Sequence, residues 1–464
     1  MHSNRRLFWG VVCIALTIFT HSASARQELT ESKVKKLVTD AYIWGFAIVE
    51  NYKGIYFYGG IDENSPVYTP FNTVKHMSMF YDHTVTTVVS GNNDTFYSNG
   101  ILDLRAEPIV FHVPEVEEDR YYTFQLTSMT TDNFGYIGSR STGTKEGYYA
   151  ITGPSFTEKL PEYIKQIKSP SEFVCVIGRT AVYNKEDAKT VMDIQKKYKL
   201  IPLSKLHPEY NPKPVPEIEW PKYSPDILNT TSFFEYLNWL LQFHQFGNEE
   251  QDLVNKFSAI GVIPGEKYTF YKDNPKYQQA INAAIKNGYT RAMELSNSIG
   301  KTINGWDLAP YNVKYFGNNY NLRTGWAVKA IYVNDPEEAY YPAANFDIDG
   351  NPLNGQYNYK LHFKADELPP AKFFWSLTMY YADNKLMVEN PIGRYSIGDR
   401  TEGLKYAADG SLTIYLSHKE PKEGSSNWLP TPNREWYILM RIYGPKQSVL
   451  KGKWVPKGIE KVSD

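Results

Sequence analysis

The sequence predicts an α+β fold that is mainly β, with two antiparallel β-sandwich-like domains and an intervening helical segment. Short runs that alternate apolar and polar residues fill the first and last thirds of the chain, a pattern typical of antiparallel strands. The middle carries apolar residues at the spacing of amphipathic helices. The 464 residues exceed the roughly 250–300 at which a single core stops growing, so we expect more than one domain.

The first domain is expected to open with a helix over residues 31–52, where Val34, Leu37, Val38 and Ala41 recur at helical spacing. A block of short strands follows, interrupted by turn residues, which favours an antiparallel sandwich over a parallel sheet. The predicted strands are residues 83–89, 96–104, 108–113, 120–128, 134–138 and 173–183.

The middle of the chain is predicted to be helical, with a Pro-rich linker over residues 202–225, between the first of its helices and the later ones, that cannot hold regular structure. Asn184 is placed to cap a helix that ends near Tyr198. Gly261 and Gly300 mark the ends of two later helices, since Gly commonly follows a helix terminus. The later helices are expected over residues 232–246, 249–260 and 275–299, and strands return at 326–333, 356–363, 373–381, 412–417 and 436–443.

The N-terminus has the pattern of a secretory signal peptide. Arg5 and Arg6 precede a short apolar run, and Ala23-Ser24-Ala25 supplies small residues for cleavage near Ala25. The run is shorter than the about 20 residues that span a membrane. We therefore expect a periplasmic or secreted protein without a transmembrane anchor in the mature chain. The expected parts are 1–25 signal peptide, 26–183 N-terminal helix plus β-sandwich domain, 184–325 helical segment and 326–464 C-terminal β-sandwich domain.

Charge and cysteine content exclude several classes of protein. The chain has 50 basic and 51 acidic residues, without the basic cluster that a nucleic-acid partner requires. Loss of the signal peptide leaves Cys175 as the one cysteine, so no intramolecular disulfide can form. Cys175 lies in an apolar run, which predicts a buried, inert thiol.

No cofactor or metal site is predicted. No two histidines of the mature chain are spaced as a local metal pair. Asp347, Asp349 and Asn351 have calcium-loop spacing, but Pro352 stands where the loop requires Gly. A turn explains these residues better.

Several strings carry a family resemblance. Residues 92–98 (Asn-Asn-Asp-Thr-Phe-Tyr-Ser) lead to Leu102-Asp103-Leu104, and the C-terminal strings are residues 409–415, 426–430 and 441–445. Together they resemble the paired domain-of-unknown-function families 1254 (N-terminal) and 1214 (C-terminal) of bacterial envelope proteins. The resemblance covers most of the mature chain and implies the same split into two domains. It implies an architecture and no particular reaction.

The first candidate site combines Asn92, Asp94, Tyr97 and Ser98. In a catalytic interpretation Asp94 is a general base or ligand anchor and Tyr97 is its hydrogen-bond partner. In the alternative interpretation the Asn-Asn-Asp string forms an Asx turn before a strand.

The second candidate site is a ligand-binding set from the last third of the chain. Arg394, on a tight loop, could hold a carboxylate or a sugar hydroxyl through its planar guanidinium, and Trp428 sits on a stiff loop as a stacking platform. Alternatively, Arg394 pairs with Asp399 or Glu389 and Trp428 closes the end of the sandwich. The full set of ligand-binding candidates is Asn92, Arg140, Trp375, Asn390, Arg394, Tyr395 and Trp428.

Three functions compete. The 37 Tyr, 23 Phe and 10 Trp residues suit a protein that binds a small polar or carbohydrate-like ligand in an aromatic-lined cleft, although β-propensity alone enriches aromatic residues. The second is a hydrolase that uses Asp94 with Asp103 or Asp132 as paired carboxylates. The third is a structural envelope protein that assembles through strand edges, and a homo-oligomer is compatible with the sequence.

Overall fold

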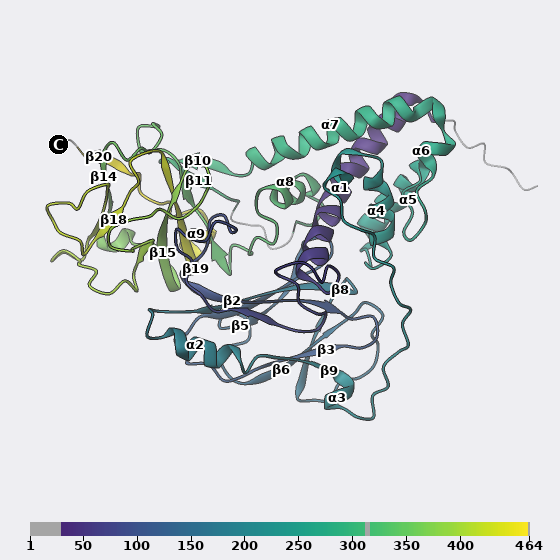
Figure 1. Ribbon diagram of the computed structural model, residues 1–464, viewed down its shortest axis with the longest axis horizontal. Helices are drawn as coiled ribbons and strands as arrows, with labels where there is room; N and C mark the ends of the chain where they lie inside the picture. The colour runs from purple at the N-terminus through teal and green to yellow at the C-terminus, as the bar shows by residue number, and fades with distance from the viewer. Residues whose placement is uncertain (1–28, 311–315, 463–464) are drawn as a thin grey trace, which may run out of the picture.

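The protein is described by a computed structural model that places residues 29–310 and 316–462. The predicted signal peptide, residues 1–25, lies outside these residues. Figure 1 shows three bodies: a β-rich N-terminal body below, a helical body at the upper right and a β-rich C-terminal body at the left. The class is α+β with two sandwich-like bodies and a helical segment between them, as the sequence predicts.

The N-terminal body packs a five-stranded sheet, in the order β1-β2-β8-β4-β5, against a four-stranded sheet, in the order β7-β6-β3-β9. All neighbours are antiparallel except β6 and β7. The strands are β1 Lys75–Met77, β2 Thr95–Asp103, β3 Ile109–Val113, β4 Tyr122–Thr127, β5 Asn133–Gly138, β6 Gly147–Thr152, β7 Ile164–Lys168, β8 Phe173–Ala181 and β9 Lys199–Pro202. Two short helices, α2 Ala188–Gln195 and α3 Leu203–Leu206, lie in the same body.

The two faces of the five-stranded sheet differ in chemistry. Leu102, Phe124, Leu126, Val174 and Val176 point into the sandwich and form its apolar core. Because side chains alternate along a strand, the residues between them point away from the core. This outer face carries the paired sets Met77–Tyr97–Arg179–Thr123 and Lys75–Asn99–Ile177–Gln125.

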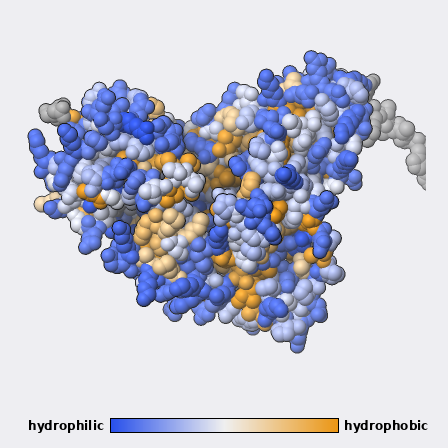
Figure 2. Space-filling view, in the orientation of Figure 1, coloured by the Kyte–Doolittle hydropathy of each residue, from blue (hydrophilic) through white to orange (hydrophobic). Residues whose placement is uncertain are grey.

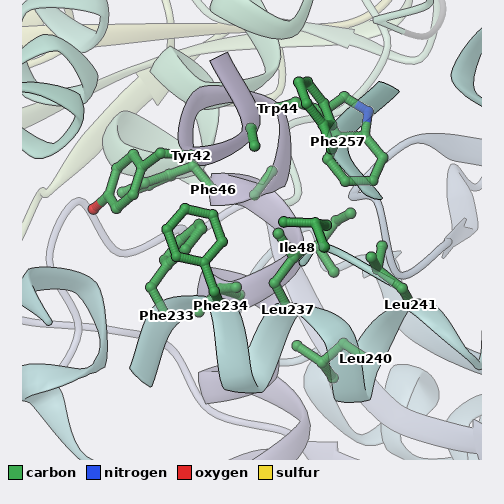
Figure 3. Close-up of a cluster of buried hydrophobic side chains, with 14 of the residues drawn as sticks. Tyr42, Trp44, Phe46, Ile48, Phe233, Phe234, Leu237, Leu240, Leu241 and Phe257 are labelled. Atoms are coloured by element: carbon green, nitrogen blue, oxygen red, sulfur yellow. The ribbon is translucent and has the colours of Figure 1, made fainter. Parts of the chain in front are cut away.

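The helical body is built on α1, which runs from Glu31 to Tyr58 and starts at a Thr30 side chain that accepts from Lys33 N. Aromatic and aliphatic side chains of α1 meet those of α4 and α5 in a dense core (Figure 3). The helices are α4 Ser232–Leu241, α5 Asn248–Phe257, α6 Phe270–Asp273, α7 Gln278–Asn297 and α8 Tyr320–Ala330. The first helix therefore packs mainly on helices from the middle of the chain, 170 residues and more along the sequence.

The C-terminal body pairs a seven-stranded sheet with a four-stranded one. The larger sheet has the order β10-β11-β13-β19-β15-β16, with β12 also on β19, and the smaller has the order β18-β17-β14-β20. The strands are β10 Lys301–Ile303, β11 Trp306–Leu308, β12 Ala339–Tyr340, β13 Ala343–Ala344, β14 Asn358–Phe363, β15 Ala371–Tyr381, β16 Ser396–Gly398, β17 Leu412–Ser417, β18 Trp428–Pro430, β19 Trp436–Pro445 and β20 Glu460–Val462. The body also holds the α-helix α9 Gln447–Leu450 and the 3-10 helix η4 Ala365–Glu367.

Two predicted strands are not strands. Residues 326–333 fall largely in helix α8, because Asn319 caps it through Leu322 N and because Arg323 and Thr324 donate to the carbonyls of Trp44 and Ile43 on α1. These tertiary contacts override the β-propensity of the run. Residues 83–89 form a loop, which an Asx turn at Asp82 starts by accepting from Thr84 N.

Candidate functional site

A cavity of about 450 Å³ lies over the outer face of the five-stranded sheet, where the N-terminal and helical bodies meet. Its floor is formed by β1, β2 and β8, and its other walls come from the end of α1, the loop before β2 and residues 331–332 after α8. Figure 2 shows apolar surface in the hollow between the C-terminal body and the helical body. The volume falls in the range of small-molecule sites, about 300–1,000 Å³.

Arg179 on β8 is the charged group of the cavity floor. Its side chain is only 8% exposed, and its Nη1 donates to Gln125 Oε1 at 3.0 Å and to Asn334 Oδ1 at 3.4 Å. The guanidinium carbon lies 5.5 Å from the centre of the Tyr97 ring. Within the described residues Arg179 forms no ion pair. Burying a charge without a counter-charge is costly, so this position requires an explanation.

Lys75 on β1 is the second cation of the cavity lining. Its Nζ donates to the carbonyl oxygens of Pro66 at 3.1 Å and Tyr68 at 3.4 Å, which are neutral partners. No Asp or Glu is among the described residues that line the cavity. The electrostatic character of the cavity is therefore positive.

The remaining lining is mostly apolar and aromatic, and its side chains include Tyr58, Met77, Tyr81, Val88, Val89, Ile101, Ile177, Ile331 and Tyr332. Cys175 also faces it, and burial raises the pKa of its thiol to about 12. A thiol with a raised pKa is a poor nucleophile. This agrees with the inert thiol that the sequence predicts.

Two lining residues hold a backbone conformation that side chains disfavour. Ser90 has φ 51° and Tyr332 has φ 65°, and a left-handed tyrosine costs on the order of 1–3 kcal/mol. Tyr332 is held by its hydroxyl, which donates to Asn51 Oδ1 at 2.6 Å. Ser90 is held by the C-terminal body, since its hydroxyl lies 2.7 Å from that of Tyr437. Such strain concentrates at functional sites.

The loop before β2 is fastened to the C-terminal body through Asp94. The carboxylate is 6% exposed and accepts from Ser376 Oγ at 2.6 Å and from the Tyr443 hydroxyl at 3.1 Å. Asp94 N donates to Asn92 Oδ1 at 2.7 Å, so the Asx turn is present. Asn92 Nδ2 in turn donates to the hydroxyls of Tyr443 and Tyr97.

Arg441 and Arg400 surround the same carboxylate. Arg441 donates to the carbonyls of Ser90 and Gly91 and to Thr378 Oγ1, and the charge of Asp94 helps to raise its pKa against the opposing effect of burial. Arg400 lies 3.3 Å over the Phe374 ring, and burial lowers its pKa although Asp94 opposes the shift. The charge of Asp94 thus favours the charged form of both the buried Arg441 and the half-buried Arg400.

Two family models match the chain, one in each β-rich body. Residues 71–202 match the family described as "Protein of unknown function (DUF1254)", and residues 338–447 match "Protein of unknown function (DUF1214)". The chain belongs to the proteins that join a DUF1254 domain to a DUF1214 domain. Lys75, Asn92, Tyr97 and Arg179 lie in the DUF1254 match, whereas Ser376, Arg441 and Tyr443 lie in the DUF1214 match.

Among solved structures, the chain is similar to the VPA0106 protein from Vibrio parahaemolyticus, with 28% identity and a TM-score of 0.74 over 93% of this chain and 100% of that one. An uncharacterised protein from Burkholderia cenocepacia has 10% identity and a TM-score of 0.41, with 93% of each chain covered. No curated protein matches the chain.

The candidates from the sequence fall into separate places. Asn92 and Tyr97 line the cavity, and Asp94 lies behind them in the contact with the DUF1214 domain. Trp375 is buried in the core of the DUF1214 domain and Trp428 is buried there too, its Nε1 donating to Ser417 O.

Arg394, Asn390 and Tyr395 lie in one loop of the DUF1214 domain. Arg394 Nη1 donates to the carbonyls of Ser425 and Trp428, which leaves the guanidinium engaged with backbone and not with Asp399 or Glu389. Asn390 closes this loop on Arg394 N and O, and the Tyr395 hydroxyl lies 2.7 Å from His83 Nδ1. These residues hold neighbouring segments together.

Arg140 pairs with Glu338 across the contact between the two family domains. Glu338 is 1% exposed and also accepts from the Tyr121 hydroxyl at 2.8 Å. Arg140 does not line the cavity. No group of three or more metal-ligating side chains occurs in the described part of the chain, and no described helix is long and apolar enough to cross a membrane.

Sequence reasoning missed Arg179 and Lys75 as site residues. A signal for Arg179 was available, because it is in phase with Phe173, Cys175 and Ile177 on one face of a nine-residue strand. A charged residue in that phase indicates that the apolar face ends in a polar site or in solvent. Lys75 lies on a three-residue strand with no such pattern.

Proposed function

We propose that this protein binds a small organic anion in the cavity over β1, β2 and β8. The observation that carries the proposal is Arg179, a buried cation that faces the cavity and has no acidic partner in the described chain. A carboxylate ligand would supply the missing counter-charge and accept charge-assisted hydrogen bonds. The proposed ligand class, small organic anions, is thus more specific than the polar or carbohydrate-like molecules expected from the composition.

The surroundings of Arg179 support binding in a fixed orientation. Gln125 and Asn334 accept hydrogen bonds from one guanidinium nitrogen, and the guanidinium carbon lies over the Tyr97 ring. A cation that is already oriented loses little side-chain entropy when it binds a ligand. Lys75 adds a second positive charge to the field within the cavity.

The geometry does not favour a hydrolase with paired carboxylates. Asp94 precedes β2 and Asp103 ends it, so nine extended residues at about 3.3 Å each separate them by about 30 Å. Asp132 follows β4 at the end where Thr127 pairs with Cys175, which is also the Asp103 end of the sheet. Paired catalytic carboxylates lie about 5–9.5 Å apart. Asp94 therefore has no second carboxylate of this set within reach.

Binding can be tested with hexanoate as the probe. Isothermal titration of the purified protein should show saturable binding that Arg179→Gln weakens by at least about tenfold, because a hydrogen bond to a charged group contributes about 1.5–3 kcal/mol. Arg434→Gln is the matched control, since Arg434 is exposed and pairs with Asp383. Equal affinity of hexanoate for the wild type and Arg179→Gln, with both folded, would contradict the proposal.

We also propose that the binding takes place outside the cytoplasm, because the first 25 residues have the tripartite pattern of a signal peptide. Cell fractionation with N-terminal sequencing tests this. The expected result is a periplasmic or secreted chain that begins near Arg26. Recovery of an uncleaved chain in the cytoplasm would contradict it.

A further inference from the structure

We infer that the ligand is an amphipathic monocarboxylate, with its head at Arg179 and a hydrocarbon body over the apolar floor of the cavity. The inference rests on the proposed anion binding and specifies the remainder of the ligand. It is carried by the order in which residues follow one another along β8 and β2, and by the side chains at the mouth of the cavity.

The floor is charged at the Arg179 end and carries apolar side chains along β8, with Asn99 on β2 as a polar neighbour of Ile177. On β8, Ile177 and Cys175 precede Arg179 and lie on the same face of the sheet. On β2, Ile101 pairs with Cys175. The step from Arg179 to Cys175 is four residues, so the apolar stretch is about 13 Å long. Ile331 and Tyr332 line the cavity from the helical side. A ligand with its charge on Arg179 would therefore lay its body on hydrocarbon.

One anionic group fits better than two. From the register of β1, β2 and β8, the α-carbons of Lys75 and Arg179 lie about 12 Å apart. The Lys75 ammonium is turned to the carbonyls of Pro66 and Tyr68, whereas Arg179 has neutral side-chain partners only. Arg179 is thus the anchor for the head, and Lys75 contributes long-range attraction.

The mouth of the cavity is also apolar. Val88, Val89 and Tyr58 line the cavity and are 39%, 63% and 50% exposed. Together these side chains form a small exposed apolar surface beside the cavity. A hydrocarbon tail that reaches the mouth would bury them. A compact polar anion would leave these side chains exposed to water and would bury no apolar surface of the floor.

The test is a series of straight-chain carboxylates, butanoate, hexanoate, octanoate and decanoate, with the alcohols of matching length as neutral controls, titrated into the full-length mature protein. Affinity is expected to rise by up to about fourfold for each added methylene until the floor is filled. The alcohols are expected to bind at least tenfold more weakly than the acids.

The outcomes separate the two proposals. Binding that depends on Arg179 and on the carboxylate, but not on chain length, overturns the hydrocarbon body and leaves anion binding intact. Binding that rises with chain length equally for acids and alcohols, and that Arg179→Gln does not change, overturns the anion proposal and with it this inference. The absence of binding for every member of the series overturns both.

Two sets of variants locate the body. Ile177→Thr keeps the branched shape while adding a hydroxyl to the floor, and is expected to weaken decanoate more than butanoate. The pair Val88→Ser and Val89→Ser, at exposed positions that leave the core unchanged, should lower the affinity for decanoate several-fold and leave butanoate unaffected. Val462→Ser, at a valine 38% exposed in the DUF1214 domain, is the matched control. Equal losses for long and short acids in the valine pair would overturn the placement of the tail.

Discussion

Two regions beside the five-stranded sheet hold arginine side chains in different electrostatic surroundings. At the contact with the DUF1214 domain, Arg140 faces Glu338, and Arg441 and Arg400 lie close to Asp94. Under the helical body, Arg179 donates hydrogen bonds to the side-chain amides of Gln125 and Asn334 and lines a cavity. A buried cation with a counter-charge contributes to the stability of the fold, because removing either partner leaves an unpaired buried charge. A buried cation with neutral partners only, such as Arg179, is the basis of the proposed anion site.

The largest expected effect is at the compensated site. Arg140→Met leaves the Glu338 carboxylate, which is 1% exposed, with the Tyr121 hydroxyl as its main remaining donor. We expect a loss of about 3 kcal/mol in the free energy of unfolding, because breaking a buried pair strands a charge. Urea unfolding followed by circular dichroism measures it. The control Arg434→Met, at an exposed pair, should cost under about 1 kcal/mol. Similar costs for both variants would remove the basis of the comparison.

The second effect concerns the carboxylate shared by the two domains. Tyr443→Phe keeps the ring stacked on Phe374, whose centre lies 4.2 Å away, and removes the hydroxyl that contacts Asp94 and Asn92. We expect a loss of about 2 kcal/mol, since one of the lost hydrogen bonds is to a charged group. Tyr415→Phe, at a half-buried position on β17, is the control. Unchanged stability of Tyr443→Phe would show that Asp94 is solvated and not a fastening point.

A pH effect sharpens the comparison at Asp335, beside Arg140. Burial raises the pKa of Asp335 from 3.8 to about 7, although a hydrogen bond from Asn133 and the charge of Arg140 oppose the shift. Between these two values the folded state holds more protons than the unfolded state, so stability falls as pH rises from about 4 to 7. We expect Asp335→Asn to reduce this fall by roughly 1.5 kcal/mol, allowing for solvent screening of a partly exposed group. Denaturation midpoints at pH 5 and pH 8 measure it, and parallel pH profiles for the two proteins would contradict it.

The smallest expected effect is at the uncompensated arginine in the absence of ligand. Arg179→Met should change the free energy of unfolding by less than about 1 kcal/mol, because removal of a desolvated charge offsets the loss of its two hydrogen bonds to neutral amide oxygens. The same variant should lose the stabilisation that hexanoate gives the wild type. A cost like that of Arg140→Met would mean that Arg179 is a structural residue, and the distinction between the two regions would not hold.

Much of the architecture could be predicted from the sequence, because it follows from local periodicity. The alternation in β4 and the helical spacing in α1 both produced the expected elements, although α1 continues to Tyr58. Residues 326–333 were mistaken for a strand, because the contacts of Arg323 and Thr324 with α1 depend on residues nearly 300 positions away. Local propensity does not contain such information.

The site was predictable only in part. The string that contains Asn92 and Tyr97 was recognised, and both residues line the cavity. The roles of Arg394 and Trp428 could not be read from residue types, since their partners are backbone carbonyls. Arg179 was not among the candidates, because the side of the sheet that another body covers is set by tertiary structure.

Arg441 links the DUF1214 domain to a loop that lines the cavity of the DUF1254 domain. Its guanidinium, which belongs to the DUF1214 domain, donates hydrogen bonds to the carbonyls of Ser90 and Gly91, and both residues line the cavity of the DUF1254 domain. Neither domain on its own would form the complete cavity. The DUF1254 domain supplies the floor, and the DUF1214 domain supplies Arg441, which holds the loop at Ser90 and Gly91 in place. Because this contact joins the two domains, there is a physical reason for both domains to lie on a single polypeptide.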